Sequence, residues 1–179
     1  MSASVDEQVL LDAARAGDVA CFNALVARHQ DAAYDLAYRL LGDAAAAARA
    51  TEGALLTAYR ALPAFRGGSF RVWLLGVVAR ACRNQRERRP RQPDAPPGRP
   101  RADDTLAVHD DLCQRVEAGI AGLPWEQRLV LVLSDVEGLG YGEIAQVTGA
   151  SPAAVRLRLG SARAQLRDWL HGVATDGLQ

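Results

Sequence analysis

The chain has 179 residues, enough for one large domain or two small ones, and its composition, 49% hydrophobic and 23% charged, is that of a globular protein. Three scattered cysteines, with no CxxC pair and no histidine at ligand spacing, exclude a disulfide framework and favour a reduced intracellular protein. The start lacks the pattern of a signal peptide and the apolar run at 72–79 is too short to span a bilayer, so we expect a cytoplasmic protein.

The formal charge is zero, but it is segregated along the chain. Residues 1–79 hold 7 arginines against 8 acids, 80–101 hold 8 against 2, 102–151 hold 2 against 9, and 152–179 hold 4 against 2. Two basic segments on a neutral or acidic body can bind phosphates locally, so a nucleic-acid partner is not excluded. The opposite charges of the second and third segments also favour association of the two halves of the chain.

Four helices are predicted in the first half of the chain. Apolar residues recur at three- and four-residue spacing over four segments, 5–17, 18–42, 43–62 and 69–89. Gly17, Gly42 and the pair Gly67-Gly68 separate these segments. No alternating strand pattern with hairpin signals is present, so the predicted fold class is all-α.

A linker follows these helices. Five of the eight prolines fall between residues 90 and 100, and no helix or central strand tolerates that density, so residues 88–105 read as a flexible Pro/Arg-rich connection. Fully extended, it could reach roughly 55 Å. We therefore expect two helical modules, with boundaries at 1–88 for the first module, 89–105 for the linker, 106–172 for the second module and 173–179 for a tail.

The second module has the layout of a helix-turn-helix. We expect a helix that starts near Thr105, capped by neighbouring aspartates, and a helix over 125–138 that starts after Pro124. A short helix over 141–149 and a longer one over 151–170 follow, with Ser151 as N-cap and Pro152 at the first helical position. A short helix, a glycine-containing turn and a capped helix are the order in which a helix-turn-helix is built.

The last helix has two possible interpretations. It could close a core with its arginines in solvent, or it could read DNA. At 100° per residue, one predicted buried face holds Val155, Leu159, Ala162, Leu166, Trp169 and Leu170. In a recognition helix, the residues facing base edges would be Ala154, Leu157, Arg158 and Ser161. Arg156 and Arg163 would suit phosphates.

Taken in order, three stretches resemble the extracytoplasmic-function (ECF) sigma factors of bacterial RNA polymerase. Residues 16–43 resemble the start of the family's region two, 59–75 its loop and tryptophan-bearing helix for the minus-10 promoter element, and 123–170 its region four, which reads the minus-35 element. The third is the most specific, because the Leu-Pro start, "DVEGL", "EIA" and "AVRLRL" occur at the family's spacing. The resemblance favours the DNA-reading interpretation of the last helix.

The resemblance implies a minus-10 interface in the first module. Its expected residues are Phe65, Arg66, Ser69, Phe70, Arg71, Trp73, Arg80, Arg83 and Asn84. Aromatic and arginine side chains suit unpaired bases and a single-strand backbone. For the aromatic residues, and for Trp73 above all, core packing is the alternative.

The resemblance also implies that the third helix docks on the clamp helices of the polymerase β′ subunit, while the second module meets the β flap. The expected docking residues are Arg49, Glu52, Gly53, Leu55 and Leu56. Here the sequence departs from the family's pattern, since Arg49 replaces an expected acid, Glu52 a glutamine and Gly53 a glutamate. A reversed charge weakens a docking contact, and a mid-helix glycine costs roughly 1 kcal/mol of helix stability.

Further departures lie at the DNA-facing positions. The loop at 65–70 is one residue shorter than usual, Arg80 stands where an asparagine is typical, and Asn84 where an aspartate is. In the last helix, Leu157 and Gly160 replace polar or basic residues. Leucine can contact a thymine methyl, but it donates no hydrogen bond.

Two functions therefore remain open. The first is a sigma factor that directs RNA polymerase to specific promoters, with core polymerase, promoter DNA and an anti-sigma factor as partners; such a factor could be held at the membrane by its anti-sigma partner. The second is a sigma-like protein with a degenerate docking helix that acts as a DNA-binding regulator or needs an auxiliary subunit. We expect this protein to have no enzymatic activity, cofactor, metal site or small-molecule substrate. The three histidines, which could act as bases or metal ligands, lie in separate segments of the chain: His29, His109 and His171.

Overall fold

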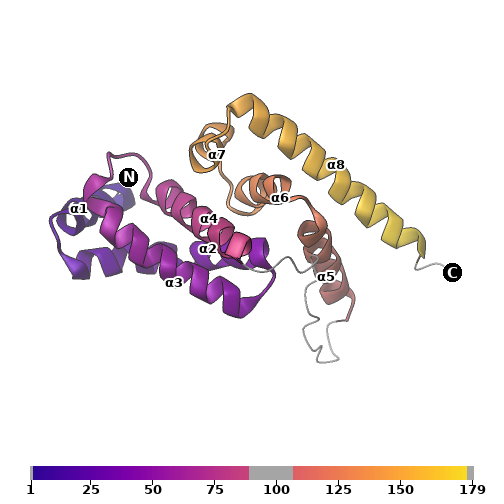
Figure 1. The fold of residues 1–179 in the computed structure, drawn as a ribbon, viewed down its shortest axis with the longest axis horizontal. Helices are drawn as coiled ribbons and strands as arrows, with labels where there is room; N and C mark the ends of the chain where they lie inside the picture. The colour runs from indigo at the N-terminus through magenta and orange to yellow at the C-terminus, as the bar shows by residue number, and fades with distance from the viewer. Residues whose placement is uncertain (1, 89–106, 177–179) are drawn as a thin grey trace.

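The computed structural model describes residues 2–88 and 107–176, and every regular element within them is helical, as predicted (Figure 1). The proline-rich segment and the expected aspartate cap before Thr105 lie outside the described residues. The first module contains α1 (Ser2–Arg15), α2 (Val19–Leu41), α3 (Ala44–Ala61), the 3-10 turn η1 (Leu62–Ala64) and α4 (Phe70–Arg88). The second contains α5 (Ala107–Gly122), α6 (Trp125–Leu131), the π-helical turn η2 (Val132–Val136), α7 (Tyr141–Thr148) and α8 (Pro152–Asp176).

Side-chain caps set the helix boundaries in the first module. The Asp18 carboxylate accepts a hydrogen bond from the backbone N–H of Cys21 at 3.0 Å, and Asp43 does the same for Ala46 at 2.6 Å. Each bond satisfies an N–H that has no partner within the helix. Between these caps Gly42 ends α2 with φ +67°, a left-handed conformation that favours glycine.

Helix α3 packs closely between α2 and α4 because its inner face is made of small residues. The buried residues of α3 are Ala46, Ala47, Ala50, Thr51, Ala54 and Ala58. A second cluster, which includes Phe22, Leu25, Phe65 and Phe70, joins α1 and α2 to the start of α4. The small inner face brings the helix axes together and leaves the opposite face of α3 in solvent.

In the second module, α6 and α7 both pack against α8. The single helix expected over 125–138 is instead α6 followed by the π-helical turn, after which the N–H of Leu139 donates to the carbonyl of Leu133 at 2.9 Å and Gly138 adopts φ +69°. Helix α8 continues to Asp176, beyond residue 172, where we expected the module to end. Trp169, expected on the buried face, is 47% exposed and donates its indole N–H to the carbonyl of Arg115 at 3.3 Å.

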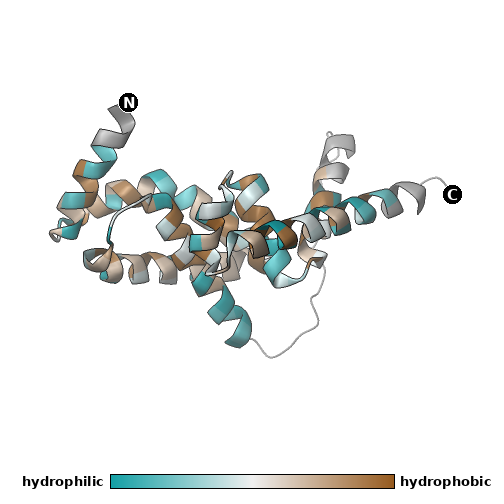
Figure 2. Cartoon of the chain, turned by 90° about the horizontal axis from the view of Figure 1, so that it is seen from above, coloured by the Kyte–Doolittle hydropathy of each residue, from teal (hydrophilic) through white to brown (hydrophobic). Residues whose placement is uncertain are grey.

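The two modules pack together and share one apolar core. That core combines Leu40, Leu75 and Val78 of the first module with Leu129 and Ile144 of the second. Figure 2 shows hydrophobic residues concentrated where the helices of the two modules meet. The principal contact is α4 against α7, which approach closely enough that a Cβ at Gly76 would lie 3.8 Å from the Val147 Cα. The modules therefore form a closed arrangement.

A buried arginine ties the modules together through backbone carbonyls. Arg128, 8% exposed, donates from Nη1 to the carbonyl of Leu40 at 2.9 Å, near the end of α2. Its Nη2 donates to the carbonyls of Ala121 and Leu123, where α5 ends and α6 begins. A cation suits the C-terminal end of a helix, where carbonyls lack partners.

Among the described residues, three ion pairs cross the interface. They join Arg39 to Glu117 at 3.8 Å, Arg71 to Glu137 at 2.5 Å and Arg83 to Glu126 at 3.4 Å. All three acids come from the acidic segment 102–151, as the charge pattern predicts. Two of the three arginines belong to α2 and the start of α4, so the basic partner is not mainly the segment 80–101.

Replacing Leu129 by alanine should test the shared core. Leu129 is 1% exposed, so Leu129→Ala should lower the free energy of unfolding by about 3 kcal/mol, measured by urea denaturation. The same substitution at Leu56, 61% exposed, should change it by less than about 0.5 kcal/mol. Equal effects at the two positions would contradict this assignment of the core.

Candidate nucleic-acid interface

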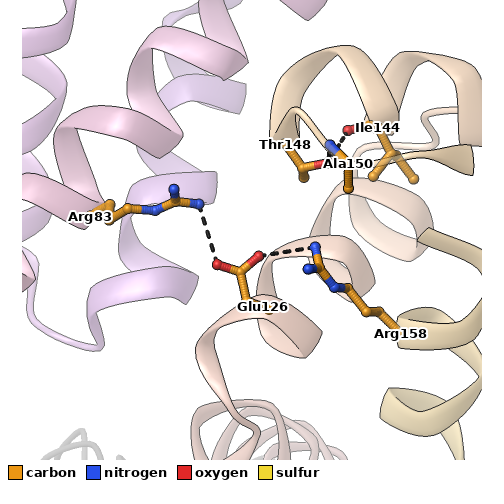
Figure 3. A network of polar contacts seen from close by, with 6 residues as sticks. All are labelled: Arg83, Glu126, Ile144, Thr148, Ala150 and Arg158. Carbon is orange, nitrogen blue, oxygen red and sulfur yellow. Dashed lines mark hydrogen bonds and ion pairs between the residues drawn. The ribbon is translucent and has the colours of Figure 1, made fainter. Parts of the chain in front are cut away.

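The turn between α7 and α8 is rigidly held. Gly149 adopts φ +69°, and the Thr148 hydroxyl donates to the carbonyl of Ile144 at 2.7 Å while accepting from the N–H of Ala150 at 3.3 Å (Figure 3). The hydroxyl of Ser151 then accepts from the N–H of Ala154 at 3.2 Å, which makes it the predicted N-cap. The first turn of α8 is therefore fixed relative to α7.

The N-terminal half of α8 has one buried and one exposed face. Val155, Leu159 and Ala162 are at most 1% exposed and belong to the shared core. On the opposite side, Leu157 is 69% exposed and Ser161 lies in solvent, whereas Ala154 is half-buried. The helix therefore closes the core and also presents an outward face, which reconciles the two interpretations of its sequence.

The three arginines of α8 that we expected to contact DNA differ in their hydrogen-bond partners, which helical periodicity does not predict. Arg158, expected to face bases, donates from Nη1 to the Glu126 carboxylate on α6 at 3.2 Å. Arg163, expected to face a phosphate, binds both oxygens of Asp135 at 2.5 and 3.1 Å, and this hydrogen bonding lowers the pKa of Asp135. Arg156 is exposed and has no hydrogen bond or ion pair to a described residue. Of these three arginines, only Arg156 is free to meet a phosphate in this arrangement.

Six of the nine expected minus-10 residues line a hollow of about 480 Å³ between the loop at 65–69 and α4, whereas Phe70, Arg71 and Arg83 do not. Gly67 and Gly68 adopt φ +101° and +94°, so the loop depends on glycine at both positions. The lining includes Arg66, Ser69, Trp73, Arg80 and Asn84. These residues combine exposed cations and polar groups with an aromatic wall, which is the chemistry that an unpaired base requires.

Two of the three aromatic residues expected to contact DNA are instead part of the core. Phe65 and Phe70 are 5% and 1% exposed, and both rings pack against Trp73 at centroid distances of 5.1 and 5.6 Å. Their apolar neighbours bury them, so the alternative of core packing holds for both phenylalanines. Trp73 is half-buried and lines the hollow, so only this aromatic ring offers a substantial surface there.

Two of the expected DNA contacts of α4 are engaged by the second module. Arg71 binds Glu137, whose side chain is 5% exposed; burial raises the pKa of Glu137 and the guanidinium opposes that rise. Arg83 binds Glu126. Gln146 and Val147 of α7 also form part of the wall of the hollow. The second module therefore covers part of the surface that the sequence assigns to the minus-10 element.

The expected polymerase-docking residues share the outer face of α3. Arg49, Glu52, Gly53 and Leu56 are exposed, and Leu55 is half-buried. The helix is continuous through Gly53. The departures from the family's pattern thus change the chemistry of this face and leave its backbone intact.

Other candidate chemistry is sparse in the described part of the chain. Residues 2–88 and 107–176 contain no group of three or more His, Cys, Asp and Glu side chains able to hold a metal. Cys21, Cys82 and Cys113 are unpaired, and burial raises the pKa of the Cys82 thiol to about 12. No helix among the described residues is long and apolar enough to cross a membrane.

Sequence reasoning missed the carboxylates that bind the DNA-facing arginines. Glu126 lies 43 residues from Arg83 and 32 from Arg158, and Asp135 lies 28 from Arg163. Helical periodicity gives the face of a side chain but not its partner on another helix. One feature of the sequence did point to these partners. The acidic stretch 102–151 has an excess of seven negative charges, so its carboxylates are expected to pair with arginines of the basic helices.

Comparison with known proteins identifies the two modules. A family model for Sigma-70 region 2 matches residues 25–92, and one for Sigma-70 region 4 matches residues 113–166. The ECF RNA polymerase sigma-E factor of Escherichia coli is 30% identical over 91% of this chain and 93% of its own length. The chain belongs to the ECF sigma factors of bacterial RNA polymerase. The first module therefore contains region 2 and the second region 4.

One further relative and two solved structures are also similar to this chain. The ECF RNA polymerase sigma factor SigE of Mycolicibacterium smegmatis is 33% identical over 82% of this chain, which spans 60% of that relative's length. Among solved structures, CnrH in complex with the cytosolic domain of CnrY has a TM-score of 0.73 at 28% identity, covering 93% of this chain and 98% of CnrH. RpoE of Bartonella quintana, solved with the anti-sigma factor NepR, has the same fold at 19% identity and a TM-score of 0.69, covering 84% of this chain and 96% of that chain.

Membership of this family decides between the two functions that the sequence left open. The chain is a transcription initiation factor that directs RNA polymerase to promoters, with core polymerase and promoter DNA as its partners. Sigma factors are not enzymes. The sigma-like regulator with a degenerate docking helix is not favoured.

The pairing of Arg163 with Asp135 can be checked by pH titration. Because a hydrogen bond to the charged carboxylate lowers the pKa of Asp135, Arg163→Gln should raise it towards its ordinary value, as read by NMR. With the folded pKa depressed, the stability that the pair contributes is present above the unfolded pKa and is lost as pH falls through the folded one. The control variant Arg156→Gln should leave the titration of Asp135 unchanged. A carboxyl that titrates identically in all three proteins would contradict the pairing.

Proposed function

We propose that this sigma factor divides its work among three surfaces. The outer face of α3 docks on core RNA polymerase, the hollow beside α4 receives the minus-10 element, and the N-terminal half of α8 reads the minus-35 element. The observation that carries this proposal is the outward face of α8, with Arg156, Leu157 and Ser161 exposed on a helix whose first turn is capped and anchored. A recognition helix needs such a face at its N-terminal end.

For region 4, the proposed contacts are Arg156 to a phosphate and Leu157 to a base edge. An exposed leucine contributes no hydrogen bond, so its expected contact is the C5-methyl of thymine. Arg158 and Arg163 join these contacts only after leaving their carboxylate partners. Ala154 and Ser161 leave room for close approach of the helix to the groove.

For region 2, the proposed contacts are Arg66, Ser69, Trp73, Arg80 and Asn84 around the hollow. Arg71 and Arg83 are further contacts in an arrangement that separates them from region 4. The buried Phe65 and Phe70 support Trp73 from behind. In the closed arrangement α7 contributes Gln146 and Val147 to the wall of this hollow, so movement of α7 would change its shape.

We also propose an anti-sigma factor as a partner of the closed form. The two modules together match CnrH bound to the cytosolic domain of CnrY. A partner that stabilises the closed arrangement keeps the hollow covered. We place the protein in the cytoplasm, where a membrane-bound anti-sigma factor could also hold it.

Docking on polymerase is testable through Leu56. The protein should co-elute with core RNA polymerase in gel filtration, and Leu56→Ser should weaken that binding about tenfold, the loss expected when an apolar side chain no longer becomes buried. Val9→Ser, at an equally exposed valine of α1, should bind as the unaltered chain does. Failure of the unaltered protein to join core polymerase would refute the proposal.

The minus-35 contacts can be separated by footprinting the polymerase complex on its promoter. Leu157→Ser should change which sequences are protected, since it replaces an apolar base contact by a hydroxyl. Arg156→Ala should weaken binding to all sequences and reduce the salt slope of log K by about one, as expected for one lost phosphate contact. An unchanged footprint for Leu157→Ser would show that this face does not read DNA.

A further inference from the structure

The carboxylate of Glu126 lies between two arginines that come from different modules. Its Oε1 is 3.4 Å from Nη2 of Arg83 on α4, and its Oε2 is 3.2 Å from Nη1 of Arg158 on α8 (Figure 3). The three side chains are 43%, 43% and 37% exposed for Glu126, Arg83 and Arg158. The carboxylate is therefore shared by two cations at a site that ions and ligands can reach.

Both arginines belong to surfaces that the proposed function assigns to DNA. Arg83 lies on the basic end of α4, and Arg158 lies on the DNA-reading half of α8. A carboxylate presents the same kind of anionic oxygen to a guanidinium as a DNA phosphate does. One carboxylate thus pairs with a proposed DNA-contacting arginine of each module.

We propose that the Glu126 carboxylate competes with DNA phosphates for two arginines. It binds Arg158 within region 4 and Arg83 across the closed interface, and so keeps both from DNA. The inference rests on the proposed DNA contacts of both modules and adds a regulation to them. Without this carboxylate, two guanidinium groups would face each other across the interface. Its contact with Arg83 therefore favours closure, and its contacts with both arginines lower DNA affinity.

The other interface contacts show why Glu126 is distinctive. The Arg39–Glu117 pair, at 3.8 Å, also joins the modules, but neither residue belongs to a proposed DNA contact. The Arg71–Glu137 pair has its carboxylate almost fully buried, 5% exposed, where DNA cannot replace it without opening the interface. Among the three cross-interface pairs of the described residues, only that of Glu126 involves an accessible carboxylate with two DNA-facing arginines.

The closed arrangement reinforces this competition at the hollow of region 2. Gln146 and Val147 form part of its wall, together with Arg80 and Trp73. When the modules separate, the hollow loses this part of its wall and Arg83 leaves Glu126 in the same step. DNA that binds Arg83 and Arg158 removes both cations from the carboxylate and so favours separation.

Glu126→Gln in the full chain tests the proposal, with Glu117→Gln as matched control. Both variants remove one negative charge and one cross-interface ion pair, but only the first frees DNA-facing arginines. Binding to a fluorescently labelled duplex of mixed sequence is followed by anisotropy over a range of salt concentrations. Glu126→Gln should bind several-fold more tightly at low salt, with a slope of log K against log salt steeper by about two, one for each freed arginine.

The outcomes separate the two proposals. Glu117→Gln should leave the slope of log K against log salt as it is in the unaltered chain. The double variant Glu126→Gln/Arg158→Gln should lose about one unit of the extra slope that Glu126→Gln shows. If Glu126→Gln matches the unaltered chain in affinity and slope, or if Glu117→Gln steepens the slope equally, the competition proposal is wrong while the proposed DNA contacts stand. If none of the folded proteins binds the duplex at low salt, the proposed DNA contacts fail and the competition with them. Circular dichroism confirms that each variant is folded.

Discussion

One buried guanidinium positions the helix ends that meet between the two modules. Arg128 satisfies backbone carbonyls near the end of α2, at the end of α5 and at the start of α6, so a single side chain joins the two modules and also shapes the entry of α6. Burying a charge is unfavourable unless its donors are satisfied, and carbonyls near helix C-termini are suited to a cation. The position of α6 then decides where Trp125, Glu126 and Leu129 lie, and through them how region 4 faces α4.

The interface around Arg128 combines two kinds of interaction with different consequences. The apolar core, from Leu40 and Val78 to Leu129 and Ile144, does not depend on salt, whereas the half-exposed ion pairs around it are screened by salt. The core therefore sets most of the stability of closure. The ion pairs contribute little net energy but decide which arginines are available at the surface.

Much of the local structure could be predicted from the sequence because it depends on neighbours. The caps at Asp18, Asp43 and Ser151 and the left-handed glycines 42 and 149 involve residues a few positions apart. The pairing of Glu126 with Arg83 and the burial of Phe65 and Phe70 depend on how helices pack, which spacing along the chain does not contain. An aromatic residue beside arginines gives the same sequence pattern whether its ring stacks on a base or packs against another ring. Trp169 is a further example. It lies at the spacing of the buried residues of α8, but this part of the helix extends beyond the core and the side chain is exposed.

The close contact between α5 and α8 has a mechanical consequence. A Cβ on Gly119 would lie 2.5 Å from Leu166 Cδ1 and 2.6 Å from Trp169 Cδ1, so a side chain at residue 119 would force these two side chains to shift. Helix α8 has 25 residues, a length of about 38 Å, and Gly119 meets it well beyond the DNA-facing turn. A larger residue at 119 would therefore disturb the packing of the C-terminal half of α8 without altering any residue that faces a groove.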